Sequence, residues 1–253
     1  MGLVAMNLVM VLLVFLPPKR STVRGVVVFR GVPPVVSSYD LMHLDPACAA
    51  ALGSRVFAPE WKLSTNRARP ELAAALSSSP TNATRAGLAG AVVRIVSPVQ
   101  SADSDGVATN VGIVEIHDCQ MTPRRLVVWT NQPVELCNSA TTPQTMEIAG
   151  PGVSAPKTIP LASGQRSERL SLAAAGQFVT VSPRGRPWLR TDIVALAPQP
   201  FAVSDEDGVF EFRGRIPNEG ATLELLHPQA GRKTFRLTKD ALRALIVLEI
   251  GTE

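Results

Sequence analysis

Apolar and polar residues alternate with a period of two in many short runs of this chain. Clear examples are Arg125–Thr130, which reads Arg-Leu-Val-Val-Trp-Thr, and Glu168–Leu172, which reads Glu-Arg-Leu-Ser-Leu. Alternate residues of a strand face the same side of a sheet, so this period predicts strands with one buried face. Gly, Pro, Asn and Asp turn signals separate the runs at spacings of roughly 8–14 residues, which is typical of β-sandwiches.

The pattern predicts strands along most of the chain and therefore an all-β fold. The predicted strands are Thr22–Arg30, Ala91–Val96, Val111–Ile116, Arg125–Thr130, Val134–Asn138, Thr145–Ile148, Ser167–Ser171, Gln177–Ser182, Ile193–Ala197, Phe201–Val203, Val209–Phe212, Ala221–Leu226, Arg232–Leu237 and Leu245–Ile250. Pro70–Leu76 is expected to form a short helix with proline at its first position. The rest of residues 65–88 reads as a surface insertion, and Ser101–Gly106 as a polar linker.

The N-terminus carries an apolar run, Leu3–Leu16, interrupted only by Asn7 and ended by two prolines. A membrane-spanning helix needs about 20 apolar residues, whereas this shorter run suits the core of a signal peptide. No basic residue precedes the run, and Lys19 and Arg20 follow it. We therefore expect residues 1–20 to be a signal peptide of an exported, periplasmic or extracellular protein. A retained membrane anchor and a buried N-terminal element remain alternatives.

Composition limits the class of partner. The chain has 253 residues, of which 45% are hydrophobic and 18% charged, so it can fold as one large or two small globular domains. Its net charge is only +4, and no dense Lys/Arg run with interleaved aromatic residues occurs. We therefore expect no nucleic-acid partner.

Three cysteines are present: Cys48, Cys119 and Cys137. In an oxidising compartment, an odd number predicts one disulfide and one free thiol. There is no Cys-x-x-Cys pair, and the spacing matches no zinc site. Cys137 lies in a predicted strand, where we expect a buried and unreactive thiol.

The segment Val181–Arg190 reads Val-Ser-Pro-Arg-Gly-Arg-Pro-Trp-Leu-Arg. It resembles the Cys-x-x-His-Pro-Trp-Met-Arg metal loop of cupredoxin-like secreted proteins, often labelled methylamine-utilisation-like. Pro183, Arg186 and Leu189 stand at the Cys, His and Met positions of that loop. Gln144 stands where the upstream histidine is expected. A type 1 copper site needs two imidazoles, a thiolate and a weak axial ligand, so the resemblance implies a cupredoxin-like domain that has lost its copper ligands and carries no cofactor.

The same resemblance implies a disulfide. Members of that family often carry a cysteine in an Asp-Pro-x-Cys segment, present here as Asp45–Cys48, and another before their second domain, present here as Cys119. The pairing implied is therefore Cys48–Cys119.

A second resemblance concerns the C-terminal part of the chain. Val203–Phe212 contains Asp-Glu-Asp-Gly-Val-Phe, and Ile216–Leu225 contains Ile-Pro-Asn-Glu-Gly. Both are similar to strand and turn motifs of the carboxypeptidase-regulatory-like, or transthyretin-like, module, an Ig-type sandwich. The resemblance implies that this module comprises residues 21–100 plus 198–253, with a cupredoxin-like Greek-key sandwich, residues 110–197, inserted in it. Two consecutive sandwich domains remain the alternative.

Other metal sites and catalytic motifs are poorly supported. The histidines His43, His117 and His227 lie in separate segments. His117 and Cys119 share a strand face but lack a third soft ligand. His227 precedes a proline in a predicted turn, where we expect a solvated loop residue. The acidic segment Asp205–Gly208 lacks the distant glutamate of a calcium loop and reads as a β-turn. No hydrolase or nucleotide-binding motif occurs, so we expect no enzyme.

The degenerate loop leaves a cluster of basic residues as the candidate binding rim. Its members are Arg124, Arg184, Arg186, Trp188 and Arg190. Arginine beside an exposed aromatic ring is suited to binding carboxylates, phosphates or a protein partner. The leading interpretation is that Pro187-Trp188 closes the end of the sandwich core while the arginines keep the rim soluble.

Taken together, the motifs predict a non-catalytic exported binding module, or a structural module associated with the cell envelope. Its expected partner is an unidentified protein or polysaccharide of that envelope, and any membrane contact would be made only through an uncleaved N-terminal segment. The alternative is a copper-binding electron-transfer or copper-handling protein with unusual ligands.

Overall fold

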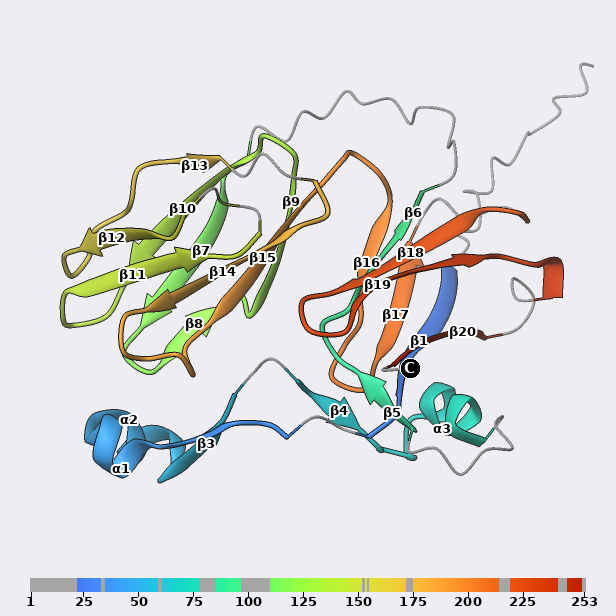
Figure 1. Cartoon of the computed structure of the whole chain (residues 1–253), viewed down its shortest axis with the longest axis horizontal. Coiled ribbons are helices and arrows are strands. Elements are labelled where there is room, and N and C mark those ends of the chain that lie inside the picture. The colour runs from blue at the N-terminus through green and yellow to red at the C-terminus, as the bar shows by residue number, and fades with distance from the viewer. Residues whose placement is uncertain are drawn as a thin grey trace, which may run out of the picture.

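Strands dominate the computed structural model of the chain (Figure 1). It describes residues 22–32, 35–58, 61–77, 85–96, 110–151, 153, 155–171, 175–213, 219–240 and 245–251. The predicted signal peptide, residues 1–20, and the predicted linker, residues 101–106, lie outside these ranges. The prediction of an all-β fold with two sandwiches is confirmed, because the described strands form two pairs of packed sheets.

We call the pair of sheets built from residues 112–196 the inner sandwich. Its strands are β7 (Gly112–His117), β8 (Gln120–Thr122), β9 (Arg125–Trp129), β10 (Pro133–Asn138), β11 (Gln144–Ala149), β12 (Lys157–Leu161), β13 (Leu170–Ser171), β14 (Phe178–Pro183) and β15 (Thr191–Leu196). One sheet has the order β13-β10-β7-β8 and the other β12-β11-β14-β15-β9. Buried residues of both sheets, among them Val114, Leu136, Met146 and Val181, meet in one core.

The other pair of sheets, the outer sandwich, uses strands from both ends of the chain. Its strands are β1 (Thr22–Arg30), β4 (Leu63–Ser64), β5 (Arg85–Leu88), β6 (Val92–Ile95), β16 (Phe201–Val203), β17 (Val209–Arg213), β18 (Thr222–His227), β19 (Gly231–Arg236) and β20 (Ile246–Gly251). Strand β1 pairs with β17 and β5 and runs parallel to β20, while β6 lies between β16 and β18. Helix α3 (Pro70–Ser77) packs Leu72 and Ala75 against Val26 and Val28 of β1.

A small element, which we call the cap, lies below the inner sandwich in Figure 1. It comprises β2 (Ser38–Asp40), α1 (Leu41–Leu44), α2 (Pro46–Leu52) and β3 (Arg55–Phe57), with β2 and β3 paired. Asp40 and Asp45 begin the two helices, since their carboxylates accept hydrogen bonds from the backbone N–H groups of Met42 and Cys48. Among the described residues, no helix combines the length and apolar character that crossing a membrane requires.

The two sandwiches contact each other through a compact apolar cluster. Val92 and Leu226 of the outer sandwich are buried against Val194 and Leu196 of the inner one. The rings of Trp129 and Phe201 lie edge to face beside them, with centroids 5.5 Å apart. This cluster is the apolar contact between the two sandwiches.

The predicted strands all have counterparts, most within one or two residues, and the predicted helix extends to Ser77. Ser167–Ser171 was predicted too long, because only Leu170 and Ser171 pair, with β10. The pattern missed the cap helices and the short strands β2, β3, β4, β5, β8 and β12. Most of these strands have two to four residues, too few to show a period of two. The edge strand β12 runs through Pro160, a residue that argues against a strand in a sequence pattern.

Candidate functional site

The loop that joins β14 to β15 closes one end of the inner sandwich. The side chains of Trp188 and Leu189 belong to the sandwich core, and both residues are only 4% exposed. The Trp188 ring lies 5.6 Å from that of Tyr39, centroid to centroid, at the start of the cap. The burial of Trp188 agrees with the leading interpretation that Pro187-Trp188 closes the end of the sandwich core, because the cap and the core cover this ring on both sides. The alternative interpretation, an exposed aromatic ring in a binding rim, is wrong for Trp188.

The positions that resemble copper ligands hold other chemistry. Pro183 is the last residue of β14 and pairs with Met146 of β11. Gln144 is buried, and its Nε2 donates to Thr142 Oγ1 over 2.9 Å. None of the four positions supplies a thiolate or an imidazole, so they do not fit a type 1 copper ion. Within the described ranges, no group of three or more His, Cys, Asp or Glu side chains is placed to hold a metal.

At the histidine position of the loop, Arg186 forms an ion pair with the cap. Its Nε lies 2.9 Å from Oδ2 of Asp45, a residue that is only 6% exposed, and its Nη1 donates to the Asp118 carbonyl over 3.1 Å. The disulfide Cys48–Cys119 joins helix α2 to the turn after β7, which confirms the pairing that the resemblance implied. Since Cys119 is in this bond, it is not available to share a metal with His117.

The remaining cysteine, Cys137, is free and buried, as predicted. Burial raises the pKa of its thiol, which keeps it protonated and unreactive.

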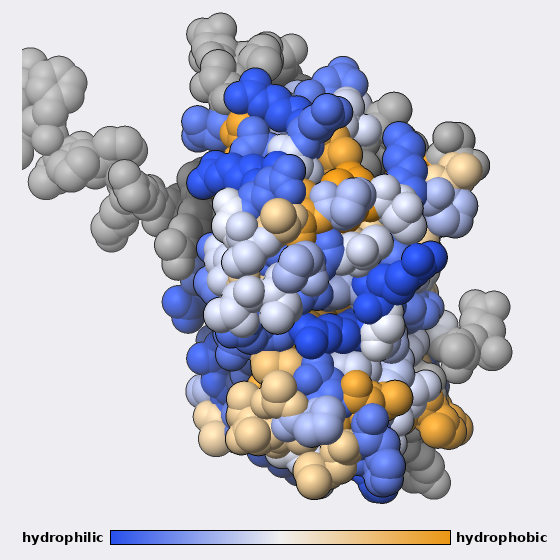
Figure 2. Space-filling view, turned by 90° about the vertical axis from the view of Figure 1, so that its left-hand side faces the viewer, coloured by the Kyte–Doolittle hydropathy of each residue, from blue (hydrophilic) through white to orange (hydrophobic). Residues whose placement is uncertain are grey.

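The outer face of the cap is apolar. Figure 2 shows orange and pale orange residues gathered in the lower part of this side of the molecule, over α1 and α2. The large side chains among the exposed residues there are Met42, Leu44 and Leu52. Exposed apolar groups gathered in this way are typical of interaction surfaces.

A pocket of about 520 Å³ lies where the two sandwiches and the cap meet, and we call it the junction pocket. Phe57 and Trp61 supply aromatic side chains to it, and Gly90 and Val203 come from the outer sandwich. The inner sandwich contributes an arginine cluster, which consists of Arg124, Arg125 and Arg190 around Asp192.

Asp192 is buried and already engaged by Arg190. Its Oδ1 lies 2.8 Å from Nε and 2.7 Å from Nη2 of Arg190, and it also accepts from Thr180 Oγ1. Arg125 is farther away, with 3.7 Å between its Nη2 and Asp192 Oδ2. The Arg125 guanidinium also lies over the Phe178 ring, 5.2 Å from its centroid. One carboxylate therefore serves two largely buried guanidinium groups.

The balance of charge in the junction pocket is positive on its inner-sandwich side. Burial lowers the pKa of Arg125 to about 10, opposed by Asp192 and helped by Arg190, so Arg125 remains charged at neutral pH. Arg124 forms no ion pair with any carboxylate in the described ranges. On the opposite side, the acidic turn is already neutralised, because Asp205 pairs with Arg69 and Glu206 with Lys62.

His227 lies buried behind this pocket and is not the solvated loop residue that its Pro228 neighbour suggested. It is the last residue of β18, only 1% exposed, and its ring stacks at an angle on Trp61 at 5.4 Å. Burial, together with the charges of Arg125 and Arg190, lowers its pKa to about 3. His227 is therefore neutral at physiological pH.

A smaller pocket of about 330 Å³ adjoins the junction pocket and shares Phe57, Arg124 and Arg190 with it. Trp188 and Leu189 also line it. The structure thus brings together three members of the predicted rim, Arg124, Trp188 and Arg190. Arg184 and Arg186 lie elsewhere: the former pairs with Glu147 over 2.9 Å, and the latter is held by the cap.

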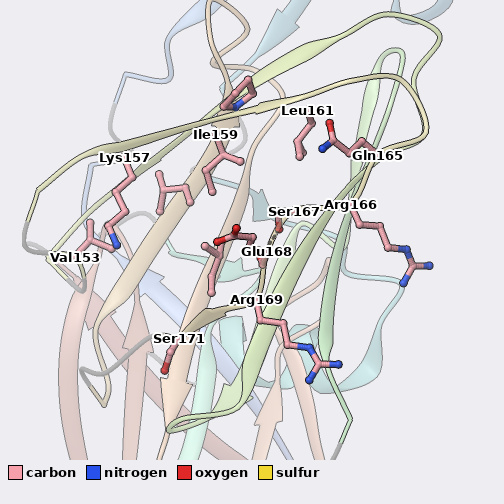
Figure 3. Close-up of a pocket in the computed structure, with 13 residues that line it drawn as sticks. Val153, Lys157, Ile159, Leu161, Gln165, Arg166, Ser167, Glu168, Arg169 and Ser171 are labelled. Carbon is pink, nitrogen blue, oxygen red and sulfur yellow. Dashed lines mark hydrogen bonds between the residues drawn. The ribbon is translucent and has the colours of Figure 1, made fainter.

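Another pocket, of about 510 Å³, lies at the side of the inner sandwich between β12 and the segment before β13 (Figure 3). Glu168 points into it, whereas Arg166 and Arg169 point away and both pair with Glu135. Its lining includes no aromatic side chain and no buried arginine cluster. The junction pocket is therefore the stronger candidate for a binding site.

Sequence reasoning missed the roles of Asp192, Gly90 and Trp61 in this pocket. Gly90 has a positive φ of 70°, and a side chain on it would meet Arg125 Nη2 at 3.0 Å. The available signal was the neighbour of Arg125, since Arg124 belongs to the predicted rim.

Comparisons with known proteins give only partial likenesses. No protein-family model matches the chain, and no curated protein matches it. A purple cupredoxin from Nitrosopumilus maritimus aligns with 33% of this chain and 98% of its own, at 15% identity and a TM-score of 0.29. Two mutants of amicyanin, one in the Cu(I) form and one reduced, each align with 41% of this chain and 97% of their own, at 19% identity and a TM-score of 0.31. At such TM-scores these likenesses assign no family, ligand or activity to the chain.

Proposed function

We propose that this protein is an exported, non-catalytic binding module built on a copper-free, cupredoxin-like inner sandwich. The outer sandwich would be a transthyretin-like support that holds it. The disulfide suits an oxidising compartment, which supports a periplasmic or extracellular location, with a protein or polysaccharide of the cell envelope as the partner. The fold alone carries no function, so the proposal depends on the state of the loop end and of the junction pocket.

One observation carries the proposal: the position of a lost histidine ligand holds an arginine that pairs with the cap. Arg186 and Asp45 together place an ion pair where a metal ligand would be needed, and a guanidinium group, which donates hydrogen bonds but does not accept them, cannot coordinate a metal. Trp188 and Leu189 are buried beside it, so this end is packed as a core. That arrangement supports a structural role for the loop end and leaves binding to the junction pocket.

Metal analysis of the purified chain tests the proposal. We expect no stoichiometric copper after purification, and no thiolate-to-copper absorption band near ~600 nm after copper is added under oxidising conditions. The matched control is Cys137→Ser, which removes the free thiol found among the described residues. Stoichiometric copper with a band that disappears in this variant would overturn the proposal and favour a copper protein with unusual ligands.

A further inference from the structure

We propose that the junction pocket binds an acidic sugar residue, with its carboxylate on the arginine cluster and its ring against Phe57 and Trp61. The inference rests on the proposed function, because it names the ligand of the same binding module. Its natural source would be a uronate-containing polysaccharide.

The first argument concerns unused hydrogen-bond donors. Nε and Nη1 of Arg125 are buried and have no hydrogen-bond partner among the described residues. A buried charged donor without a partner is costly, and such groups are usually satisfied by an acceptor. Asp192 does not fill this role, because it lies 3.7 Å from Arg125 and is held by Arg190. Because the side chain of Arg125 lines the pocket, an anion there would balance the guanidinium charge that Asp192 only partly offsets.

The second argument concerns the kind of anion. A guanidinium presents its donors in a planar fork that matches the two oxygens of a carboxylate. Arg124, exposed on the same side, provides a further positive charge beside this fork. On the other side of the pocket, Arg69 and Lys62 are already paired with Asp205 and Glu206, so the positive charge available to a ligand is that of the inner sandwich alone. The pocket therefore favours one carboxylate per binding unit over a polyphosphate.

The third argument concerns the rest of the ligand. Phe57 is 67% exposed, and Trp61, which is partly exposed, is held in place by its contacts with Phe29 and His227. Aromatic faces beside polar groups suit a ring that has both apolar C–H and polar edges, as a pyranose has. A volume of about 520 Å³ accommodates a ligand of that size.

Binding of oligogalacturonate, monitored by amide NMR shifts of the full chain, tests the inference. We expect shifts at Gly90 and Ser204, which line the pocket, and no response to a matched neutral galactose oligomer. Arg124→Gln should weaken binding about tenfold, because a charge-assisted hydrogen bond is lost. Arg184→Gln makes the same charge change outside the pocket and should leave the affinity unchanged.

A second pair of variants tests the ring contact. Phe57→Ala should weaken binding several-fold, whereas Met42→Ala, which truncates an exposed apolar residue of the outer cap face, should not. Equal weakening by Arg184→Gln, or acetate binding as tightly as the uronate, would overturn the inference. So would the absence of shifts at saturating oligogalacturonate. If the protein carries no copper and does not bind uronate, only this inference is contradicted. If the protein carries copper and binds uronate, only the proposed function is contradicted.

Discussion

The capped end of the inner sandwich and the junction pocket both contain arginine beside a buried aspartate, but the two regions use them differently. At the capped end, Arg186 meets Asp45 over 2.9 Å, one charge for one charge. At the junction, Arg125 and Arg190 share Asp192. The first arrangement balances one cation with one carboxylate, although Asp45 Oδ2 accepts no hydrogen bond from the described residues. The second has two cations for one carboxylate and leaves Nε and Nη1 of Arg125 without a hydrogen-bond partner among those residues.

This difference separates a structural ion pair from a binding site. Burying a charge costs free energy unless the charge is paired. A buried cluster with more cations than carboxylates therefore persists only where a ligand supplies the missing negative charge, or where the rest of the fold is stable enough to offset the cost. The capped end is also fixed by the disulfide and by the buried Trp188 side chain. We therefore expect changes at the capped end to alter stability, and changes at the junction pocket to alter binding.

Removal of the disulfide should have the largest effect. The double variant Cys48→Ala, Cys119→Ala opens a loop with a sequence separation of 71 residues, for which chain entropy predicts a loss of about 4 kcal/mol of unfolding free energy. Denaturant unfolding, with and without reductant on the parent protein, measures it. If the fully reduced protein unfolds at the same denaturant concentration as the oxidised one, the cap does not depend on this link.

The next effect distinguishes the two kinds of arginine directly. Arg186→Gln leaves the Asp45 carboxylate buried without its ion-pair partner and should cost about 2 kcal/mol of unfolding free energy. Arg124→Gln, at an exposed arginine of the junction pocket, should change it by less than about 0.5 kcal/mol. Denaturant unfolding of both variants measures the contrast.

A double variant serves as the control for that prediction. Adding Asp45→Asn to Arg186→Gln removes the stranded charge while Asn can still begin helix α2, so part of the loss should be recovered. Equal stability losses for Arg186→Gln and Arg124→Gln would remove the distinction between the regions.

The sequence predicted the sheet framework well because burial pattern and strand period are local. Strand β14 is an example, since the positions of Phe178–Pro183 alternate between half-buried and buried, as the sheet requires. The cap was not predicted, because α1 and α2 are too short for a helical period to appear. Contacts from distant segments hold it: Leu41 packs in the inner core, and Asp45 pairs with Arg186.

The candidate pocket could be predicted only in part for a related reason. Arg124 and Arg190 came from one loop motif and its neighbouring rim, and both do line the pocket. Trp61 and Gly90 reach it through pairings between strands far apart in the chain, which no local pattern reveals. His227 shows the same limit: a turn does follow it at Pro228, yet a ring from a distant segment, Trp61, helps to bury it.

The last and smallest effect is a change in the free energy of unfolding with pH, and it comes from His227 at the junction. Its pKa in the folded protein is about 3, against about 6.5 for an unperturbed histidine. Between pH 6.5 and pH 3, His227 binds a proton in the unfolded chain but not in the folded chain. The free energy of unfolding therefore falls as the pH falls through this range. From pH 6 to pH 5 the loss from this group should be about 1 kcal/mol.

Denaturant unfolding at several pH values checks this, with His227→Asn as the diagnostic variant. Asparagine can accept the backbone hydrogen bonds that His227 Nδ1 receives from Gln229 and Ala230, but it does not titrate. The variant should therefore lose about 1 kcal/mol less than the parent between pH 6 and pH 5, whatever its starting stability. If His227→Asn keeps the parent's slope, His227 accepts its proton in the folded state and its pKa is not lowered there.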